Sequence, residues 1–287
     1  MLDSVNDWTI DRAIIESAPP VSQVDIAADG DSISLVVAGV GLVKVSRNGC
    51  TVSATTSAAQ DSLVALAGNW AWGQWLGING TFSFHGVTLA RDGVGLALIG
   101  APRSGTSLTA LAMSRDGWQV IADGVCPLQS DANGISALPG RQALEVDALV
   151  TQMFPPAGSF EDAETPRKRS LVSTASADAT PIQHIIELVT TNIRTDGVVV
   201  PADTEESRPA SRLQENSIVG KALQAASSTL GAQLHDFCEQ VVSVVPFDVA
   251  LVPYGSPARP YSPMDIANLV GAYLEAAPGR SQTGATR

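Results

Sequence analysis

The stretch VGLALIGAPRSGTSLTALAMSRDG, residues 94–117, decides the expected fold of this chain. Its first six residues form an apolar run that predicts a buried strand, and the apolar spacing of residues 107–117 predicts a helix that ends at Gly117. Residues 100–107 lie between them, begin with glycine and end in serine. A strand, a glycine-bounded loop and a helix start, in this order, is the setting in which backbone N–H groups surround phosphate oxygens.

Thr106 is the residue that departs from the phosphate-loop pattern G-x-x-x-x-G-K-[ST]. In that pattern the lysine reaches the β- and γ-phosphates and the last hydroxyl binds Mg²⁺. Gly100, Gly105 and Ser107 fit the pattern, whereas Thr106 occupies the place of the lysine. None of the three lysines of the chain lies near the loop in sequence: Lys44, Lys168 and Lys221. We therefore expect a site that is shaped for phosphate but short of positive charge.

The composition indicates a soluble globular protein. The chain has 287 residues, 45% of them hydrophobic, which is enough for a buried core. No apolar run approaches the ~20 residues that a bilayer span needs, and residues 1–20 are acidic where a secretory signal would be basic. We therefore expect a cytoplasmic protein that binds no membrane. The net charge of −12 would repel a nucleic-acid backbone, so we expect no nucleic acid as a partner.

The three cysteines indicate neither a disulfide framework nor a metal site. Cys50, Cys126 and Cys238 are odd in number, widely separated and without C-x-x-C or Cys/His spacing. We expect each of them to be a small buried hydrophobic residue.

Residues 1–79 are expected to form a β-rich N-terminal part. Residues 21–55 contain four short runs rich in β-branched residues, separated by Asp-Gly, Gly and Asn-Gly turn signals, which predicts a small antiparallel sheet. Residues 58–76 have apolar positions at helical spacing. Three tryptophans gather near the end of this predicted helix: Trp70, Trp72 and Trp75. We interpret them as a packed joint between helix and sheet.

Residues 80–278 are expected to form the core of the protein. Alternating strand and helix patterns predict a mostly parallel sheet with helices against it. Two stretches read as mobile loops, near 155–169 and 195–215, and residues 279–287 as a disordered tail. The expected elements of the C-terminal part are a helix over 216–239, a strand pair over 241–255 interrupted by Pro246, and a closing helix with Ser262 as N-cap and Pro263 at its first position.

Five segments together resemble the catalytic core of HPr kinase/phosphorylase and its shorter serine-kinase relatives. They are HGV (85–87), GVGLALIG (93–100), GAPRSGTS (100–107), LTALAMSRDG (108–117) and WQVIADG (118–124). In that family a His-Gly-Val or His-Ala-Ser strand precedes the loop, the loop ends in Gly-Lys-Ser/Thr, and a strand that ends in Ala-Asp-Asp follows the helix. The resemblance is clear over residues 80–128 and continues more loosely to the closing strand and helix.

The resemblance implies an α/β fold, with a P-loop core of the HPr-kinase/phosphoenolpyruvate-carboxykinase type, a mixed sheet with helices, and a small β-rich part before it. It also implies ATP and Mg²⁺ as cofactors and a small protein or peptide as partner. The residues in catalytic places are Asp123, His85 and Arg103. Those in nucleotide-binding places are Gly100, Ser104, Gly105, Thr106, Ser107, Lys168 and Arg169, the last two in the basic segment 167–169. Ser107 and Asp123 would face the metal.

Two departures from the family pattern speak against phosphoryl transfer. Thr106 replaces the lysine, and Gly124 replaces the second acid of Ala-Asp-Asp, which leaves Asp123 alone. Phosphoryl transfer needs cations that neutralise the moving group and carboxylates that hold Mg²⁺ or accept the hydroxyl proton. Their loss should lower the rate by several powers of ten unless Arg103 or the basic segment 167–169 supplies the charge.

Several candidate residues also have a purely structural interpretation. The loop end could be a glycine-rich turn in which Ser or Thr caps the helix, and Asp123 could cap a turn. Glu145 and Asp147, at alternate positions of a strand, would share a face, but nothing else marks a site there. His184 and His235 have no acid or base at a recognisable spacing, so we interpret both as structural.

Three functions remain open from the sequence. The first is a pseudokinase that binds a protein or peptide and binds nucleotide weakly or not at all. The second is an active ATP-dependent serine kinase in which an arginine replaces the lysine. The third is a sulfotransferase, because PRSGTS also resembles the loop that binds 3′-phosphoadenylyl sulfate, although that family usually carries the loop near the start of the domain. The sequence does not indicate an oligomeric state.

Overall fold

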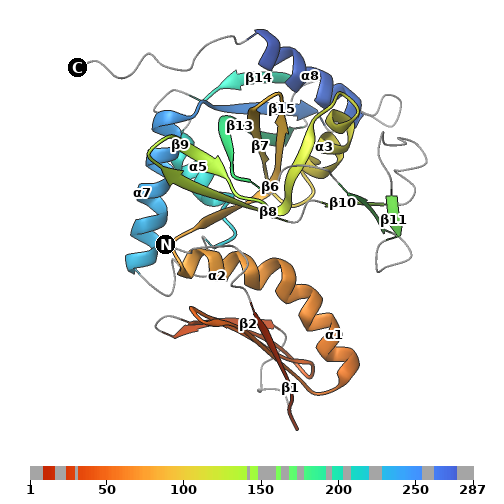
Figure 1. Ribbon diagram of the computed structural model, residues 1–287, viewed down its shortest axis with the longest axis vertical. Coiled ribbons are helices and arrows are strands. Elements are labelled where there is room, and N and C mark those ends of the chain that lie inside the picture. The colour runs from red at the N-terminus through yellow and green to blue at the C-terminus, as the bar shows by residue number, and fades with distance from the viewer. Residues whose placement is uncertain are drawn as a thin grey trace. The chain divides into compact units, whose positions relative to one another are not determined.

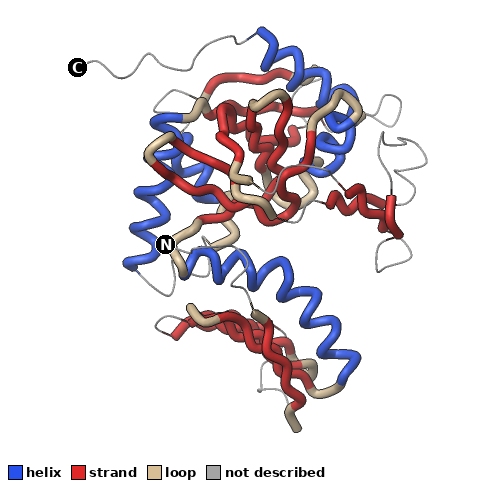
Figure 2. Tube along the Cα trace, viewed as in Figure 1, coloured by secondary structure: helices blue, strands red, loops and turns tan. Residues whose placement is uncertain are grey.

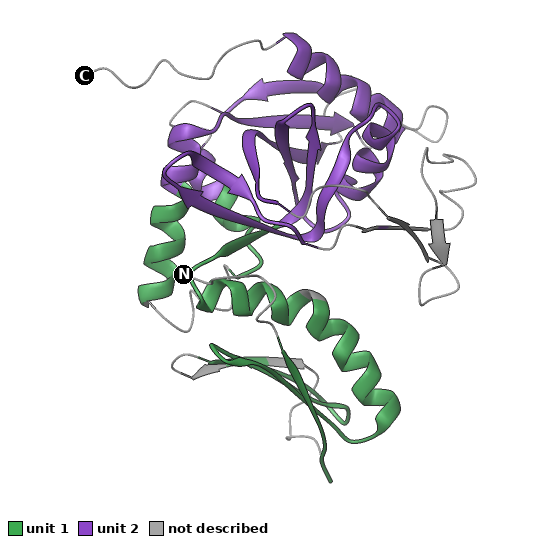
Figure 3. Cartoon of the chain, viewed as in Figure 1, with its two compact units in different colours: residues 1–84, 213–238 green, residues 85–212, 239–287 purple. Residues whose placement is uncertain are grey.

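The computed structural model describes residues 9–16, 24–29, 32–140, 143–147, 160–162, 168–172, 178–191, 196–202, 208–219, 228–253 and 262–276. The chain folds into two compact units, each made of two segments (Figure 3). The first comprises residues 1–84 and 213–238, and the second comprises residues 85–212 and 239–287. The boundaries fall within strand β6, which starts at Phe82, and within helices α5 and α7, so single elements contribute to both units.

The first unit contains a five-stranded sheet in the order β1-β5-β4-β3-β2. Its strands are β1 Ile10–Ile14, β2 Val24–Asp29, β3 Ser32–Val37, β4 Gly41–Ser46 and β5 Gly49–Ala54. The four strands expected within residues 21–55 are confirmed as an antiparallel set, and β1 adds a strand that pairs parallel to β5. Every second residue of β4 is buried, because alternate side chains of a strand point to the same face.

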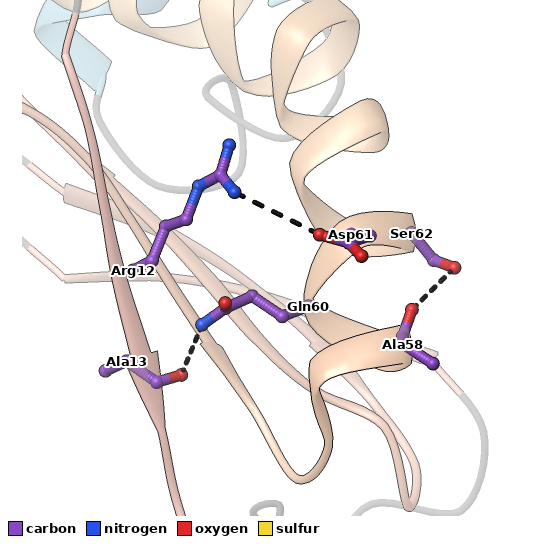
Figure 4. Close-up of polar contacts among 6 residues, drawn as sticks. All are labelled: Arg12, Ala13, Ala58, Gln60, Asp61 and Ser62. Atoms are coloured by element: carbon purple, nitrogen blue, oxygen red, sulfur yellow. Dashed lines mark hydrogen bonds and ion pairs between the residues drawn. The ribbon is translucent and has the colours of Figure 1, made fainter. Parts of the chain in front are cut away.

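Helix α1, Ser57–Leu66, covers one face of this sheet (Figure 2). The hydroxyl of Thr56 accepts a hydrogen bond from the N–H of Ala59 at 3.1 Å and so caps the helix start. Strand β1 is tied to the helix by two polar contacts (Figure 4). Gln60 Nε2 donates to the carbonyl oxygen of Ala13 at 3.1 Å, and Arg12 lies 4.0 Å from the carboxylate of Asp61.

The tryptophan-bearing segment continues from α1 as a π-helical turn, η2 Ala67–Ala71, and helix α2, Trp72–Ile78. Trp75 is 1% exposed, and its Nε1 donates to the carbonyl oxygen of Arg47 at 3.0 Å, in the turn that joins β4 to β5. The expected joint between helix and sheet is therefore present at Trp75. The polar end of the indole bonds to the backbone while its rings are buried.

The second unit contains a seven-stranded sheet in the order β14-β15-β13-β7-β6-β8-β9 (Figure 1). Its strands are β6 Phe82–Arg91, β7 Val94–Ile99, β8 Gln119–Asp131, β9 Gly134–Ala137, β13 Thr180–Thr191, β14 Val198–Pro201 and β15 Phe247–Pro253. The sheet is mixed, so the expectation of a mostly parallel sheet is corrected. β13 is parallel to β7 and to β15, while β6–β7, β8–β9 and β14–β15 are antiparallel.

The physical reason for the mixed sheet is the short connections. Asp92 and Gly93, both with positive φ, close a tight hairpin between β6 and β7, which forces these strands to be antiparallel. β13 lies about eighty residues after β7 in the chain and inserts between β7 and β15. Parallel strands need such a long crossover, whereas antiparallel neighbours need a few residues.

Helices α3, Thr106–Ser114, and α8, Pro263–Ala276, pack together on one face of this sheet (Figure 1). The core between them and the sheet is apolar and contains Val87, Leu89, Leu96, Leu98, Leu111, Met113, Ile186, Ala250 and Val270. The expected capping of α8 is confirmed. The N–H of Asp265 donates to the hydroxyl of Ser262 at 3.2 Å, and the N–H of Ser262 donates back to the Asp265 carboxylate at 2.8 Å.

Two stretches that the sequence suggested as loops contain regular structure. Strands β10 Ala143–Asp147, β11 Phe160–Asp162 and β12 Lys168–Val172 form a small antiparallel sheet, so 155–169 includes β11 and the first two residues of β12. Strand β14 and helix α5, Pro209–Glu215, lie within 195–215. The remaining parts of both stretches, and the tail 279–287, lie outside the described residues.

The prediction of a strand pair over residues 241–255 is wrong for its first half. Helix α7 spans Ser228–Val244, and only Phe247–Pro253 is a strand. Leu234, Cys238 and Val241 are buried at a spacing of four and three residues, the period of a helix, and this burial outweighs the β-propensity of the valines. Of the helix expected over 216–239, α7 covers residues 228–239, whereas residues 216–219 form a turn, a bridge and a bend. Residues 220–227 lie outside the described residues.

The three cysteines are buried and free, as expected. Burial raises the pKa of Cys50 to about 11 and shifts the pKa of Cys126 upward as well. Within the described parts of the chain, no helix combines the length and the apolar character that crossing a bilayer requires.

Candidate phosphate-binding loop

The loop of residues 100–107 joins the end of β7 to the start of α3, as the sequence predicts. The N–H of Gly100 donates to the carbonyl oxygen of His85 at 3.1 Å, and the N–H of Ser104 donates to the carbonyl oxygen of Ala101 at 2.9 Å. Arg103 and Gly105 have positive φ angles of 73° and 97°. The backbone therefore turns sharply at the carboxyl end of β7 and enters the helix through a left-handed residue.

The start of α3 has no side-chain cap. Gly105 is the N-cap residue and carries no side chain that could accept from the first N–H groups of the helix. Those N–H groups have no partner within the helix itself, and the helix dipole places partial positive charge beside them. The structural interpretation in which Ser or Thr caps this helix is therefore not what the loop shows, and the helix start presents donors that suit an anion.

Ser104 lies inside the loop. It is 7% exposed, and its Oγ has no hydrogen-bond partner among the described residues. A Cβ added at Gly100 would lie 2.5 Å from this oxygen and 2.9 Å from the carbonyl oxygen of Leu188. Glycine at position 100 therefore makes room for the Ser104 hydroxyl, and a buried hydroxyl without a partner is costly unless something outside the chain bonds to it.

Ser107 and Asp123 are joined by a hydrogen bond. The hydroxyl of Ser107, in the first turn of α3, donates to Oδ1 of Asp123 on β8 at 2.9 Å. Asp123 is 9% exposed. The resemblance implies that both residues face a metal, and the fold brings them together from positions sixteen residues apart. Hydroxyl and carboxylate oxygens are hard ligands of the kind that Mg²⁺ prefers, so this pair fits that ion.

Thr106 is the first residue of α3 and is 9% exposed. In the phosphate-loop pattern the lysine at this position reaches the β- and γ-phosphates. Threonine contributes a short neutral side chain there, so the loop keeps its donors but carries no charge at this position.

His85 contacts both ends of the candidate site. Its backbone carbonyl accepts from Gly100, and its side-chain Nδ1 lies 3.2 Å from the carbonyl oxygen of Gly124, the residue after Asp123. A carbonyl oxygen only accepts, so Nδ1 carries the proton in this contact. Gly124 has a φ of 81°, and a Cβ added there would meet nothing within 4 Å.

The arginines of the second unit whose side chains are described are mostly engaged away from the loop. Arg91 stacks over Trp118 at 4.8 Å, Arg115 contacts the sulfur of Met264 at 4.0 Å, and Arg212 pairs with Glu187. Arg103 belongs to the loop itself and is exposed, and Arg208, just before α5, is exposed as well. Lys168 and Arg169 lie on β12, with their backbones opposite Asp147 and Val146 of β10, and Arg167 lies outside the described residues.

Two polar pairs of the second unit have no sequence signal, because their members are far apart in the chain. Arg212 Nε lies 2.6 Å from the carboxylate of Glu187, which is 9% exposed. His184, on β13, is influenced by Asp248 of β15, which is 1% exposed. Burial lowers the pKa of His184, and the negative charge of Asp248 opposes that shift. Among the described residues, no group of three or more His, Cys, Asp or Glu side chains could hold a metal ion.

Comparisons with known proteins add little to this picture. No protein-family model matches the chain, and no curated protein matches it. Among solved structures, the chain is similar to the HPr(Ser) kinase/phosphatase from Coxiella burnetii, with 15% identity over 68% of this chain and 91% of that one. The TM-score of 0.31 is low. A similarity of this size carries no argument about function, so the functional proposal rests on the residues of the loop.

Proposed function

We propose that this chain is a degenerate HPr-kinase-like protein that binds the phosphates of a nucleotide weakly at residues 100–107, transfers no phosphoryl group, and acts by binding a small protein or peptide. The observation that carries the proposal is the Ser107–Asp123 hydrogen bond beside Thr106. The two oxygen groups that we propose as Mg²⁺ ligands are hydrogen-bonded to each other, while the residue at the lysine position of the pattern is neutral.

The loop geometry supports anion binding. The uncapped start of α3 presents backbone donors that a phosphate group would satisfy. The same loop does not support catalysis, because phosphoryl transfer relies on positioned cations to stabilise the charge on the moving group. Arg103, in the loop itself, is exposed to solvent and has a left-handed backbone conformation.

A protein or peptide as the partner follows from the resemblance of residues 80–128 to serine kinases that act on such substrates. A protein that keeps the binding surfaces of a kinase and loses the transfer step still recognises its partner. The net charge of −12 makes a basic segment the better electrostatic match for that partner.

Calorimetry with Mg-ATP, followed by a transfer assay with labelled ATP, tests the proposal. We expect weak binding and no transfer of label. The control pair is G105D and G105N. A Cβ at Gly105 meets open space and both residues tolerate positive φ, so the two variants differ essentially in charge. Binding should fall further in G105D, because its carboxylate would repel the phosphates at the helix start.

The outcomes separate the three functions. ATP affinity that is the same in the wild type and in G105D would show that the loop is not the site. Transfer of label to protein or peptide would favour the active serine kinase. Preferential binding of adenosine 3′,5′-bisphosphate over ATP would favour the sulfotransferase.

A further inference from the structure

We propose that the open edge of strand β1, Ile10–Ile14, is a docking site for an extended segment of another protein in which apolar and basic residues alternate. The segment would pair with β1 as an additional strand of the N-terminal sheet. This inference rests on the proposed function in one respect, because it names the surface and the chemistry of the protein or peptide partner. It does not involve the loop of residues 100–107.

The backbone of β1 has one open side. The strand lies at an edge of the five-stranded sheet, and none of the described strands pairs with its other side. Thr9 accepts a hydrogen bond from the N–H of Cys50, and Ile15 donates one to Ala54, both at 2.9 Å. Backbone groups of successive strand residues point to opposite sides, so residues 9, 11, 13 and 15 face β5. Residues 10, 12 and 14 therefore present their N–H and C=O groups outward, which is the template for strand addition.

The open edge is held in place by helix α1. Gln60 Nε2 donates to the carbonyl oxygen of Ala13 at 3.1 Å, so a helix side chain fixes β1 against the sheet (Figure 4). A strand that is already ordered loses little conformational freedom when a partner pairs with it.

The side chains along this edge form two different surfaces. Arg12 faces α1, because its guanidinium lies 4.0 Å from Asp61, and Ile10 and Ile14 share its face as alternate residues of the strand (Figure 4). Ile14 is 57% exposed and offers uncovered apolar area beside the open edge. Asp11 belongs to the opposite face and is exposed. An added strand would therefore place alternate residues beside the isoleucines and the residues between them beside Asp11.

The charge around the edge is negative. Asp11, Glu16 and Asp61 are exposed acids, and Arg12 is the one basic residue within residues 9–16 and α1. Lys44 shares the face of Asp11 but lies two strands away, a distance of roughly 10 Å at which salt screens exposed charges. The segment that fits is therefore apolar on the α1 side and basic on the side of Asp11.

A second copy of the chain fits this edge less well. A symmetric pairing of two β1 strands would bring the same three acids together, and pairing centred on Arg12 would place two arginines opposite each other. The net charge of −12 likewise favours approach of a basic partner over approach of another copy.

Strand β14, at an edge of the seven-stranded sheet, is a poorer template. The N–H of Ala202 donates to the carbonyl oxygen of Phe247, so Val199 and Pro201 are the residues of β14 that face outward. Proline has no N–H, which leaves one outward donor within this strand. The backbone therefore favours β1 over β14 for strand addition.

Binding of a labelled, capped peptide KVKVKVK to the full chain, measured by fluorescence anisotropy without nucleotide, tests the inference. The peptide EVEVEVE is the matched control of opposite charge. We expect the lysine peptide to bind at least about ten-fold more tightly at low salt, and the difference to shrink as salt is added. Equal binding of the two peptides, or no binding of the lysine peptide, would overturn the inference.

The variants R12P and R12A separate the backbone of the edge from its side chains. Both remove the arginine, and R12P also removes the N–H that faces the open side. Proline is tolerated on an edge strand where its N–H would face solvent. We expect R12P to bind the lysine peptide at least about ten-fold more weakly than R12A, and a thermal melt checks that both are folded. Equal affinity of the two folded variants would contradict strand addition at β1.

N-methylated peptides test the same point on the wild type should R12P fail to fold. The lysine peptide is methylated on the backbone nitrogens either of its valines or of its lysines, which blocks one edge of the extended peptide and leaves the other free. One of the two should lose binding and the other should keep it, because a single edge of the peptide pairs with β1. Equal effects of the two methylations would count against the inference.

Sedimentation of the wild type and R12P identifies the remaining occupant. A wild type that forms dimers and an R12P variant that does not would assign the edge to a second copy and overturn the inference. The ATP titrations of the proposed function are a separate measurement. Failure of the peptide to bind therefore leaves phosphate binding at the loop standing, and failure of ATP to bind leaves the edge of β1 standing.

Discussion

His85 and Gly124 are joined by a 3.2 Å contact between the imidazole Nδ1 and the backbone carbonyl oxygen. The backbone carbonyl of His85 also accepts from the N–H of Gly100. One residue of β6 therefore connects the first residue of the loop to the residue that follows Asp123. This arrangement suggests that His85 positions the two sides of the candidate site relative to each other.

Replacing His85 tests that connection. H85L removes the donor to Gly124 and should lower the free energy of unfolding by roughly 1 kcal/mol. H85N places an amide N–H near the former Nδ1 and should keep most of that stability. Urea unfolding of the two variants provides the measurement. Equal stability of H85L and H85N would mean that the hydrogen bond contributes nothing.

Gly124 is expected to tolerate an acid better than an alanine. Its φ of 81° disfavours residues with a Cβ by about 1–2 kcal/mol, but aspartate and asparagine adopt this conformation more readily. The space around a Cβ is open. We therefore expect thermal stability in the order wild type, then G124D and G124N, then G124A. A melt in which G124A is the most stable of the three variants would contradict the assigned backbone conformation.

Thr106 is expected to limit the affinity of the loop for phosphate. T106K should bind Mg-ATP at least about ten-fold more tightly than the wild type, because an ammonium group is added beside the phosphates. It should also bind ATP in EDTA. T106M, with a side chain of similar length and no charge, is the matched control and should show neither gain. Calorimetry distinguishes them, and a T106K variant that binds no better than T106M would argue against an anion site at the start of α3.

Gly100 is expected to be required for the shape of the loop. An alanine Cβ would lie 2.5 Å from Ser104 Oγ and 2.9 Å from the carbonyl oxygen of Leu188, so G100A should cost about 1–3 kcal/mol in stability. G271A is the control. Gly271 lies in α8 with nothing within 4 Å of an added Cβ, so alanine there should stabilise by roughly 0.5–1 kcal/mol. Denaturant unfolding of both variants should show shifts of opposite sign.

His184 is expected to make stability depend on pH. Burial lowers its pKa in the folded state below the ordinary value of 6.5, with Asp248 opposing the shift. The unfolded chain therefore binds a proton more readily, and stability should fall as the pH drops through 6.5 toward the folded pKa. The loss measured between about pH 7.5 and 5.5 should be smaller in H184Q. H235Q makes the same substitution at an exposed histidine and is the control for the substitution itself.

The local elements around the loop could be predicted from the sequence, because neighbouring residues determine them. The apolar run of β7, the glycines of the loop and the spacing of α3 specify a strand, a turn and a helix in order. Ser262 and Pro263 likewise mark the start of α8, since capping involves residues three apart. The antiparallel strands within residues 21–55 follow from alternation and turn residues in the same way.

The pairing of strands that lie far apart in the chain could not be predicted from the sequence. β13 inserts between β7 and β15, and the valines before Pro246 belong to a helix because burial along α7 outweighs their strand propensity. The ion pair between Glu187 and Arg212 could not be predicted from a sequence motif, because side chains so far apart in the chain are brought together only by packing.

The amino-acid sequence by itself determined that this loop fits the phosphate-loop pattern in its glycines and its last hydroxyl and carries threonine in place of lysine, because both are properties of eight consecutive residues. Only the tertiary structure decided that Ser107 gives its proton to Asp123 and that Ser104 turns its hydroxyl into the loop. Those contacts depend on how β8 and Gly100 lie beside the start of α3, and a hydrogen bond forms only when the fold brings donor and acceptor within reach.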